Sequence, residues 1–260
     1  MRLIRLTPLL ILLLSGCGLL PEQIDETRDW TASQFYYEAK ENLDEGDYEE
    51  AISLYETLMS RYPIGRYTQQ AQIEIAYAYY RYDEPEQAIA AADRFIKLHP
   101  QHPNVDYVYY LKGLANFNRG YGLLERFIPT DISQRDQHAS TRSFYDFEEL
   151  LKKFPDSKYA PDARRRMIYL RNNIAEYELA VARYYMKRAA HVAALNRASY
   201  IVEHYQRTPS VAEALEIMAS AYREMGMEAQ ARDAERVYAM NFPEKPPTRE
   251  AERPFWWPFE

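Results

Sequence analysis

The chain has 260 residues and a formal net charge of −7, with 24 tyrosines but only 8 glycines and a single cysteine. One cysteine excludes a disulfide bond within the chain, and the negative charge argues against nucleic acid as a partner. Apolar residues recur at helical spacing, and no run alternates with period two, so the pattern predicts an all-α protein.

Residues 1–16 have the pattern of a bacterial secretory signal. Arg2 and Arg5 precede an apolar run that is too short to span a bilayer as a stable helix. The run ends in Leu14-Ser15-Gly16-Cys17, which has the pattern of a lipobox. The small residues admit a peptidase, and the cysteine thiol is the group that can carry a thioether-linked lipid.

We therefore predict that residues 1–16 are removed and that Cys17 carries an S-diacylglycerol group and an N-acyl chain such as palmitate. No other cofactor is predicted. Two or three acyl chains anchor a protein almost permanently, whereas one chain binds a membrane only marginally. Residues 17–31 would then form a polar, lipidated tether. The alternative is an ordinary signal peptide with an incidental cysteine.

Residues 35–63 contain the unit that the rest of the chain repeats. Two helical runs flank Asp44-Glu45-Gly46-Asp47, and the positions that define the unit are Ala39, Gly46, Ala51, Tyr55 and Pro63. This spacing matches the tetratricopeptide (TPR) pattern, a helix hairpin that cannot bury its apolar face without further copies. The sequence therefore predicts a right-handed solenoid of such hairpins.

About five copies of the pattern can be read along the chain. Strong copies recur at Ala76 to Pro100 and at Ala219 to Pro243, and two degraded copies lie between them. The predicted repeats are about 32–65, 68–101, 104–156 with an insertion at 119–138, 160–207 and 210–243, followed by a proline- and aromatic-rich tail at 244–260.

The first helices of the first two repeats carry aromatic and cationic side chains at spacings that place them on one face. Counted from the repeat register, the predicted concave groove is lined by Tyr36, Lys40, Ile73, Tyr77, Tyr80 and Arg81. Such a groove suits an extended peptide. Packing between repeats is an equally good explanation for these side chains.

Two segments outside the regular repeats have no assigned role. The insertion at 119–138 is too long for a turn of this repeat type, and its apolar residues suggest that it folds back on the groove or onto a partner. The tail contains Phe255-Trp256-Trp257-Pro258-Phe259, which either caps the last helix or binds a partner.

Basic residues outnumber acidic ones between residues 150 and 200. This charge favours an acidic protein surface or lipid headgroups as the partner of that stretch.

The sequence contains no recognisable catalytic or metal-binding motif. There is no phosphate-binding glycine loop, no Gly-x-Ser-x-Gly and no cysteine nucleophile. His99 and His102 lie beside prolines in a connector and lack further ligands at metal spacing. We therefore predict that the protein is not an enzyme and binds no metal ion.

Several runs resemble the BamD family, the lipoproteins of the outer-membrane β-barrel assembly machinery. They are Arg61 to Tyr67, Ile75 to Tyr80, Asp93 to Pro100 and Asn196-Arg197, together with the lipobox and the inserted third repeat. The resemblance implies a non-enzymatic scaffold on the periplasmic face of the outer membrane. Gly18 is compatible with that location, because an aspartate there would favour the inner membrane in similar lipoproteins.

The resemblance also implies partners. The N-terminal repeats would receive the C-terminal segment of unfolded outer-membrane β-barrel proteins, and the C-terminal repeats would hold the periplasmic domains of BamA. Arg197 matches an arginine that faces BamA in this family, and BamC and BamE-type lipoproteins would also attach. The alternative is a TPR pilotin lipoprotein for secretin assembly, and an enzyme acting on peptidoglycan comes third.

Overall fold

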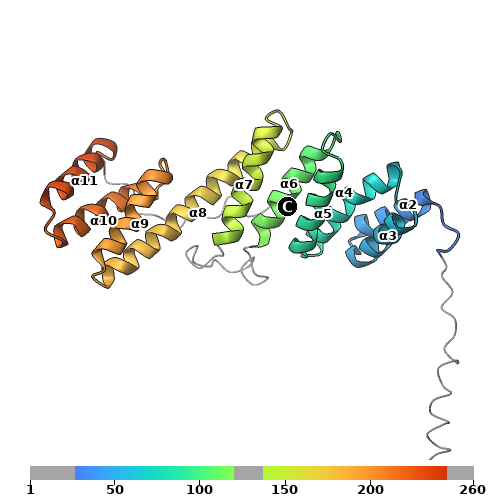
Figure 1. Ribbon diagram of the computed structural model, residues 1–260, viewed down its shortest axis with the longest axis horizontal. Helices are drawn as coiled ribbons and strands as arrows, with labels where there is room; N and C mark the ends of the chain where they lie inside the picture. The colour runs from blue at the N-terminus through green and yellow to red at the C-terminus, as the bar shows by residue number, and fades with distance from the viewer. Residues whose placement is uncertain (1–26, 120–136, 245–260) are drawn as a thin grey trace, which may run out of the picture.

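Ten α-helices, α2 to α11, follow one another through the part of the computed structural model that is described, residues 27–119 and 137–244. Consecutive helices pack as hairpins, and the hairpins form one row with α2 and α3 at one end and α10 and α11 at the other (Figure 1). The helices are α2 Ala32–Glu45, α3 Tyr48–Arg61, α4 Arg66–Arg81, α5 Pro85–Leu98, α6 Val105–Arg119, α7 Gln137–Lys153, α8 Ala160–Lys187, α9 His191–His204, α10 Ser210–Glu224 and α11 Glu228–Asn241. The all-α solenoid predicted from the repeats is confirmed, and each predicted repeat contains one hairpin.

The turn between α2 and α3 shows why the chain reverses at Gly46. Gly46 has a φ of 90°, a left-handed conformation that glycine adopts without strain, and it ends α2. Asp47 begins α3, because its carboxylate accepts a hydrogen bond of 3.2 Å from the backbone N–H of Glu50. At the start of α2, Thr31 and Gln34 form a capping box. Local chemistry thus sets both ends of α2 and the start of α3.

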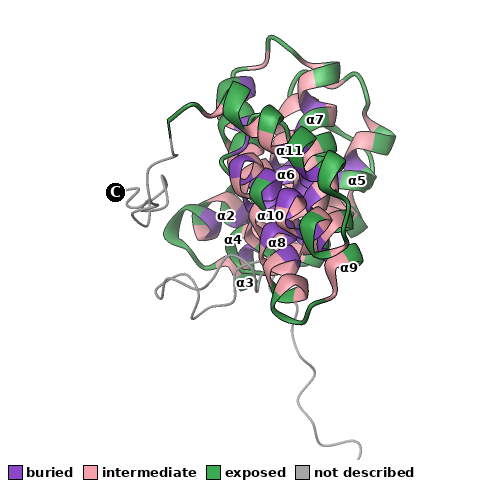
Figure 2. Ribbon diagram, turned by 90° about the vertical axis from the view of Figure 1, so that its left-hand side faces the viewer, coloured by how far each residue is buried: buried purple, intermediate pink, exposed green. Residues whose placement is uncertain are grey.

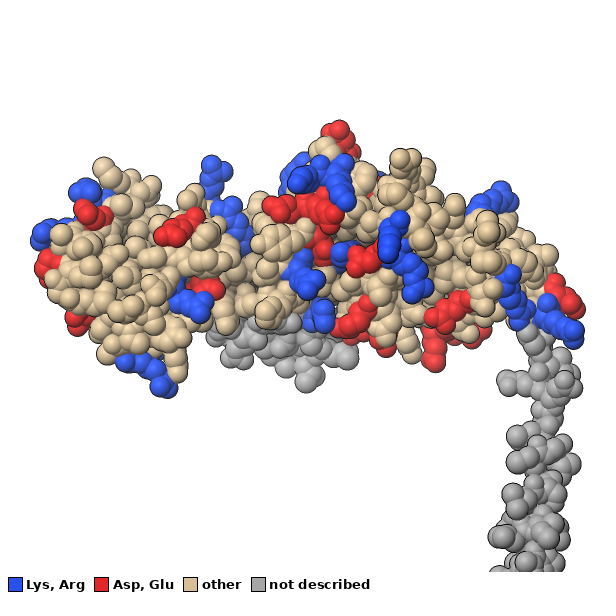
Figure 3. Space-filling view, in the orientation of Figure 1, with Lys and Arg blue, Asp and Glu red and all other residues tan. Residues whose placement is uncertain are grey.

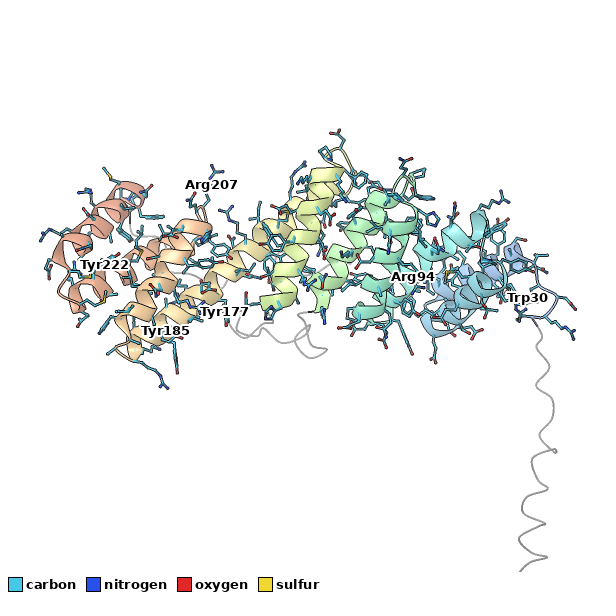
Figure 4. The ribbon with its side chains drawn as sticks, in the orientation of Figure 1. Trp30, Arg94, Tyr177, Tyr185, Arg207 and Tyr222 are labelled. Carbon is cyan, nitrogen blue, oxygen red and sulfur yellow. The ribbon has the colours of Figure 1, made fainter. Side chains whose placement is uncertain are left out.

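Residues 27–31, which the sequence assigned to the tether, belong to the first repeat instead. Arg61 Nη1 donates a hydrogen bond of 2.6 Å to the carbonyl oxygen of Thr27. Tyr62 Oη donates another, of 2.7 Å, to the carbonyl oxygen of Trp30. The ring of Trp30 packs 5.2 Å from that of Phe35 at the N-terminal end of the row (Figure 4). The last five residues of the predicted tether are therefore held against α2 and α3.

Small residues lie where the helices approach each other, as the repeat pattern requires. Ala39, Ala51, Ala88 and Ala231 are at most 1% exposed. Large side chains such as Tyr55, which is fully buried, fill the space opposite them. Buried residues lie along the middle of the row and exposed residues on its outside (Figure 2). Each hairpin therefore buries its apolar face against its neighbours.

A polar cluster lies among the apolar residues that join α5, α6 and α7. Lys112 Nζ is 2.8 Å from Asp93 Oδ1 and 3.3 Å from Asp146 Oδ1. Asn116 Nδ2 donates a hydrogen bond of 2.6 Å to Asp146 Oδ2. Burial raises the pKa of Asp146, and the lysine and asparagine oppose that rise. This cluster satisfies polar groups that the hairpin contact would otherwise leave buried and unpaired.

The long helix α8 joins the third hairpin to the fourth. It has 28 residues, which corresponds to a length of about 42 Å. Ala163 and Leu170 in its first half pack into the core around α6 and α7, whereas Leu179 and Ala182 in its second half pack with α9. Lys and Arg side chains gather where α7 turns into α8 (Figure 3), and exposed members of this group are Lys152, Lys153, Arg164 and Arg165. The basic stretch thus lies partly on the surface.

Several sequence predictions lie wholly or mainly outside the described residues. These are the signal at 1–16, the lipid site Cys17 with residues 18–26 of the tether, and the tail at 245–260. The predicted insertion at 119–138 is slightly too long at both ends, since Arg119 ends α6 and both Gln137 and His138 begin α7. Its remaining residues, 120–136, are not described.

Candidate functional site

Two of the six predicted groove residues are almost completely buried. Tyr36 on α2 is 8% exposed and Ile73 on α4 is 7% exposed. The ring of Tyr36 lies 5.6 Å from that of Tyr67 and 6.2 Å from that of Tyr55. Burial, followed by the charge of Glu74, raises the pKa of Tyr36 to about 12. For Tyr36, packing between helices is the correct alternative, because the following repeat covers this side of α2. Ile73 packs into the core as well, but it also lines the cavity described below.

The other predicted residues of α4 form a partly exposed surface of tyrosines around one arginine. Arg81 Nη1 donates a hydrogen bond of 2.7 Å to Tyr77 Oη. Its guanidinium carbon lies 5.2 Å from the ring centre of Tyr48 and 5.7 Å from that of Tyr77. Tyr80 packs beside Tyr77 with ring centres 6.4 Å apart and accepts a hydrogen bond of 2.8 Å from Asn118 Nδ2. We call Tyr48, Tyr77, Tyr80 and Arg81 the tyrosine surface.

This surface offers ring faces, ring edges and one cation, all held in place by contacts between three helices. Rings supply contact area to an extended chain, and a guanidinium can pair with a carboxylate through two parallel hydrogen bonds. Tyr48 was not among the predicted residues because it lies on α3, in the second helix of the first hairpin. The prediction from the repeat register placed groove residues only on the first helix of each hairpin.

Lys40, the sixth predicted residue, is already paired. Its Nζ lies 2.8 Å from Asp44 Oδ1, one turn away on α2, and 3.9 Å from Glu74 Oε2 on α4. Burial by itself would lower the pKa of Lys40. The hydrogen bond to Asp44 and the charges of Glu74 and Asp44 together outweigh burial and raise the pKa. Lys40 therefore borders the tyrosine surface as half of an ion pair, and its charge is largely neutralised by Asp44.

A cavity of about 190 Å³ opens beside this surface, between α4, the start of α6 and the turn before α8. Its walls include Glu74, Asp106, Tyr107, Lys158 and Tyr159. Burial raises the pKa of Tyr107, and the nearby Tyr77 and Glu74 raise it further. The residues therefore form one continuous region from the cavity to the tyrosine surface. Glu74, one of its two acidic residues, was missed from the sequence, although it lies one turn before Tyr77 on the same face of α4.

Arg197, the predicted partner contact, lies on α9 and makes an ion pair within the chain. Its Nη1 donates a hydrogen bond of 2.9 Å to Glu178 Oε2 on α8. The arginine side chain is 45% exposed and the glutamate side chain only 12%. The hydrogen bond that Arg197 donates to Glu178, followed by the negative charge of Glu178, raises the pKa of Arg197. One guanidinium nitrogen thus neutralises a nearly buried carboxylate, while much of the side chain faces solvent.

Tyrosines flank this ion pair. Tyr177 and Tyr185 lie about two turns apart on α8 (Figure 4), and both act electrostatically on Arg197. Arginine with neighbouring tyrosines is the composition typical of energetically important interface residues. Sequence reasoning missed Glu178, because spacing along one helix says nothing about which residue of a neighbouring helix an arginine will meet.

The described part of the chain contains neither a candidate metal site nor a candidate membrane-spanning helix. Within residues 27–119 and 137–244, no three His, Cys, Asp or Glu side chains come together as they would to hold a metal ion. None of the helices in these ranges is both long enough and apolar enough to cross a membrane.

Comparison with known proteins gives consistent matches over most of the chain. A family model described as outer membrane lipoprotein (YfiO) matches residues 28–237. The chain is 44% identical to the outer membrane protein assembly factor BamD of Neisseria meningitidis serogroup B, with 98% of each chain covered. It is 38% identical to the Vibrio cholerae protein of the same name, over 83% of this chain and 88% of that protein. Among solved structures, the TPR domain of P58(IPK) is 13% identical over 82% of this chain and 51% of that one, with a TM-score of 0.41, which is too distant to carry an argument.

Proposed function

Because this chain belongs to the YfiO family of outer membrane lipoproteins, we propose that it acts in the assembly of outer-membrane proteins. The observation that carries the proposal is the similarity over 98% of both chains to a protein named as an outer membrane protein assembly factor. We propose a scaffold rather than an enzyme, since the row of helix hairpins presents surfaces for other chains along its length. The name of these relatives favours this role over that of a secretin pilotin.

The first proposed surface receives unfolded β-barrel substrates. The tyrosine surface holds rings and a guanidinium within reach of one another on α3 and α4. An extended segment that ends in an aromatic residue and a free carboxylate would stack on these rings and pair with Arg81. Such a segment is what an unfolded outer-membrane protein would present before its strands pair.

This substrate proposal is tested with a labelled peptide that ends in phenylalanine and a free carboxylate. We expect Tyr77→Ala with Arg81→Ala to weaken binding by at least about tenfold, the loss of one charge-assisted contact and one ring contact. Tyr145→Ala with Arg232→Ala removes an exposed tyrosine and an exposed arginine from α7 and α11 and serves as the matched control. Equal affinity of all three proteins would remove the tyrosine surface from the substrate site.

The second proposed surface holds the periplasmic domains of BamA, with BamC and BamE-type lipoproteins as further partners. Arg197 supports this assignment through its exposure and its neighbouring tyrosines. Because Glu178 occupies one guanidinium nitrogen, a partner carboxylate would use the remaining nitrogens. The partner would therefore present a carboxylate beside apolar or aromatic contact area.

A titration with purified BamA periplasmic domains tests this contact. The informative variant is Arg197→Leu combined with Glu178→Gln, because the single change would leave Glu178 buried without its cation. We expect binding to weaken by about tenfold or more, while Arg232→Leu on α11 has no effect. Unchanged binding by the double variant would exclude Arg197 from the contact. A pull-down from envelope membranes that returned a secretin ring would favour the pilotin function instead.

We also propose that Cys17 carries the lipid that holds the protein at the periplasmic face of the outer membrane. Cys17 is the sole cysteine and ends the lipobox pattern. Metabolic labelling with a radioactive fatty acid should label the parent protein and not Cys17→Ala. Label retained in Cys17→Ala would exclude this residue as the site of acylation.

A further inference from the structure

Glu74 is a largely buried carboxylate that lacks sufficient hydrogen-bond donors. Its side chain is 21% exposed, and the nearest cation, Lys40 Nζ, lies 3.9 Å away. That ammonium is closer to Asp44, at 2.8 Å. No hydrogen bond to the Glu74 carboxylate is formed by the residues that the structure describes. Burial raises the pKa of Glu74 in spite of the opposing effect of Lys40.

A second polar group in the same region also lacks a partner. The hydroxyl group of Tyr55 is buried and makes no hydrogen bond. The side chain of Tyr55 is fully buried, and burial, followed by the charge of Glu74, raises its pKa. Buried polar groups in folded proteins are normally satisfied. Glu74 and Tyr55 therefore mark a place where the chain alone leaves hydrogen-bonding capacity unused.

The cavity gives Glu74 access to a ligand. Glu74 forms part of the wall of the 190 Å³ cavity, together with Asp106, Tyr107 and Lys158. Asp106 is already satisfied, since its carboxylate accepts hydrogen bonds of 2.6 Å from Ser157 Oγ and 2.8 Å from the backbone N–H of Tyr107. Lys158 lies against the ring of Tyr159, with Nζ 5.0 Å from the ring centre. Glu74 is thus the acidic group of the cavity with capacity to spare.

The position of Glu74 on α4 relates it to the tyrosine surface. Glu74, Tyr77 and Arg81 follow one another at intervals of three and four residues, so they lie along one stripe of the helix. The seven residues from Glu74 to Arg81 correspond to about 10 Å along the axis. An extended peptide covers that distance in about three residues. A chain whose carboxylate meets Arg81 would therefore place over Glu74 the residue three positions before its terminal residue.

We infer that Glu74 binds a lysine or arginine side chain of the extended segment whose aromatic end lies on the tyrosine surface. The inference rests on the proposed substrate function and adds the chemistry of the substrate, a basic residue about three positions before its terminal carboxylate. The cation would satisfy Glu74, and its methylene stem would pack on Tyr107 in the cavity wall. Lys40 would act as a weak internal competitor for the same carboxylate.

The test uses three labelled octapeptides that end in phenylalanine with a free carboxylate and carry lysine, norleucine or glutamate three positions earlier. Norleucine keeps the apolar stem of lysine and removes only its charge. By fluorescence anisotropy we expect the parent protein to bind the lysine peptide about tenfold more tightly than the norleucine peptide, and the glutamate peptide least of all. In Glu74→Gln the preference for lysine should fall below about twofold.

Two further variants sharpen the comparison. Glu38→Gln removes an exposed carboxylate from α2 and should keep the full preference for lysine. Lys40→Met removes the internal competitor and should increase that preference. Helical circular dichroism and the melting temperature establish whether Glu74→Gln is folded. If the variant does not fold, the ratio of the parent protein's affinities for the lysine and norleucine peptides still tests the inference.

The outcomes separate the two proposals. If the parent protein binds the lysine and norleucine peptides equally, the role of Glu74 is overturned while the tyrosine surface remains a peptide site. If Glu74→Gln weakens both peptides by the same factor, Glu74 has only a structural role and the inference fails. If no peptide binds the parent protein at all, the proposed substrate site and this inference fall together.

Discussion

The guanidinium of Arg197 neutralises a carboxylate that the packing of α8 against α9 has buried. The Glu178 side chain is only 12% exposed, and its Oε2 accepts the hydrogen bond of 2.9 Å from Arg197 Nη1. Arg197 therefore has a role in stability besides any contact with a partner. Arg197→Leu should therefore affect the stability of the fold as well as any partner contact.

We predict that Arg197→Leu lowers the free energy of unfolding by about 1 kcal/mol. Removing one member of a fully buried pair costs about 3 to 5 kcal/mol, but the exposure of Arg197 screens this pair. Arg197→Leu combined with Glu178→Gln should recover most of the loss, because no buried charge is left unpaired. Urea denaturation of the three proteins measures both effects, and equal midpoints throughout would contradict the structural role.

Glu74 should give the protein a pH-dependent stability of known sign. Burial raises its pKa above the ordinary value of 4.5, so the folded state holds this proton more tightly than the unfolded chain does. The contribution of Glu74 to stability is therefore complete below pH 4.5 and is lost as the pH rises through the higher pKa of the folded state.

From this sign we predict that Glu74→Gln is more stable than the parent protein at pH 7.5, by less than about 1 kcal/mol, because the substitution removes a poorly paired charge. The difference should shrink as the pH falls towards 4. Urea denaturation at the two pH values gives the comparison, with Glu38→Gln as the exposed control. A variant that is less stable than the parent at pH 7.5 would mean that Glu74 already has adequate partners.

The contact between α6 and α7 depends on the absence of a side chain at Gly113. A Cβ atom placed there would lie 2.5 Å from Phe147 Cε1, and the carbonyl oxygen of Gly113 accepts a hydrogen bond of 2.9 Å from Ser143 Oγ. Phe147 is fully buried, so it has little room to move. Glycine here serves the close approach of two helices, and its backbone conformation is not the reason for its presence.

We predict that Gly113→Ala destabilises the protein by a net amount of up to about 2 kcal/mol. Overpacking costs about 1 to 3 kcal/mol, and the higher helix propensity of alanine returns about 1 kcal/mol. Gly113→Ala with Phe147→Leu should cost less than the sum of the two single changes, because the smaller side chain makes room. Thermal unfolding followed by circular dichroism measures this coupling, and strict additivity would show that the two residues do not meet.

Along the full row of hairpins, stability should depend on the contacts between successive repeats. Arg183 on α8 pairs with both carboxylate oxygens of Glu213 on α10, through Nε at 2.5 Å and Nη2 at 2.6 Å. A third nitrogen, Nη1, lies 3.0 Å from Glu176 Oε1. The hydrogen bonding of Arg183 to the Glu213 carboxylate, which accepts from it, is the largest cause that raises the pKa of Arg183. This group of charges connects the last hairpin to the long helix.

We predict that Arg183→Met loosens α10 and α11 more than the rest of the chain. The pair is partly exposed, so its loss should cost about 1 kcal/mol, which corresponds to roughly fivefold faster amide hydrogen exchange in α10 and α11. Exchange in α2 to α5 should not change. Arg232→Met, on the exposed face of α11, provides the matched control. A uniform increase along the chain would show that the solenoid opens as one unit.

Sequence reasoning located the helix hairpins because their signals are local. Gly46, Asp47 and the buried alanines act through backbone conformation, capping and close helix contact, all of which depend on residues a few positions apart. Depth of burial was harder to predict. Tyr36 and Ile73 have the spacing of groove residues, yet the next repeat covers them. Tyr77 and Arg81 on the same stripe of α4 stay accessible.

The amino-acid sequence by itself determined the helix periodicity, the repeat register and the lipobox pattern that ends at Cys17. Only the tertiary structure decided which charged groups face each other across different helices: Lys40 on α2 with Glu74 on α4, and Arg197 on α9 with Glu178 on α8. Helical spacing specifies the direction of a side chain from its own axis. The partner it meets depends on the offset and crossing angle of the neighbouring helix, which the packing of many side chains sets together.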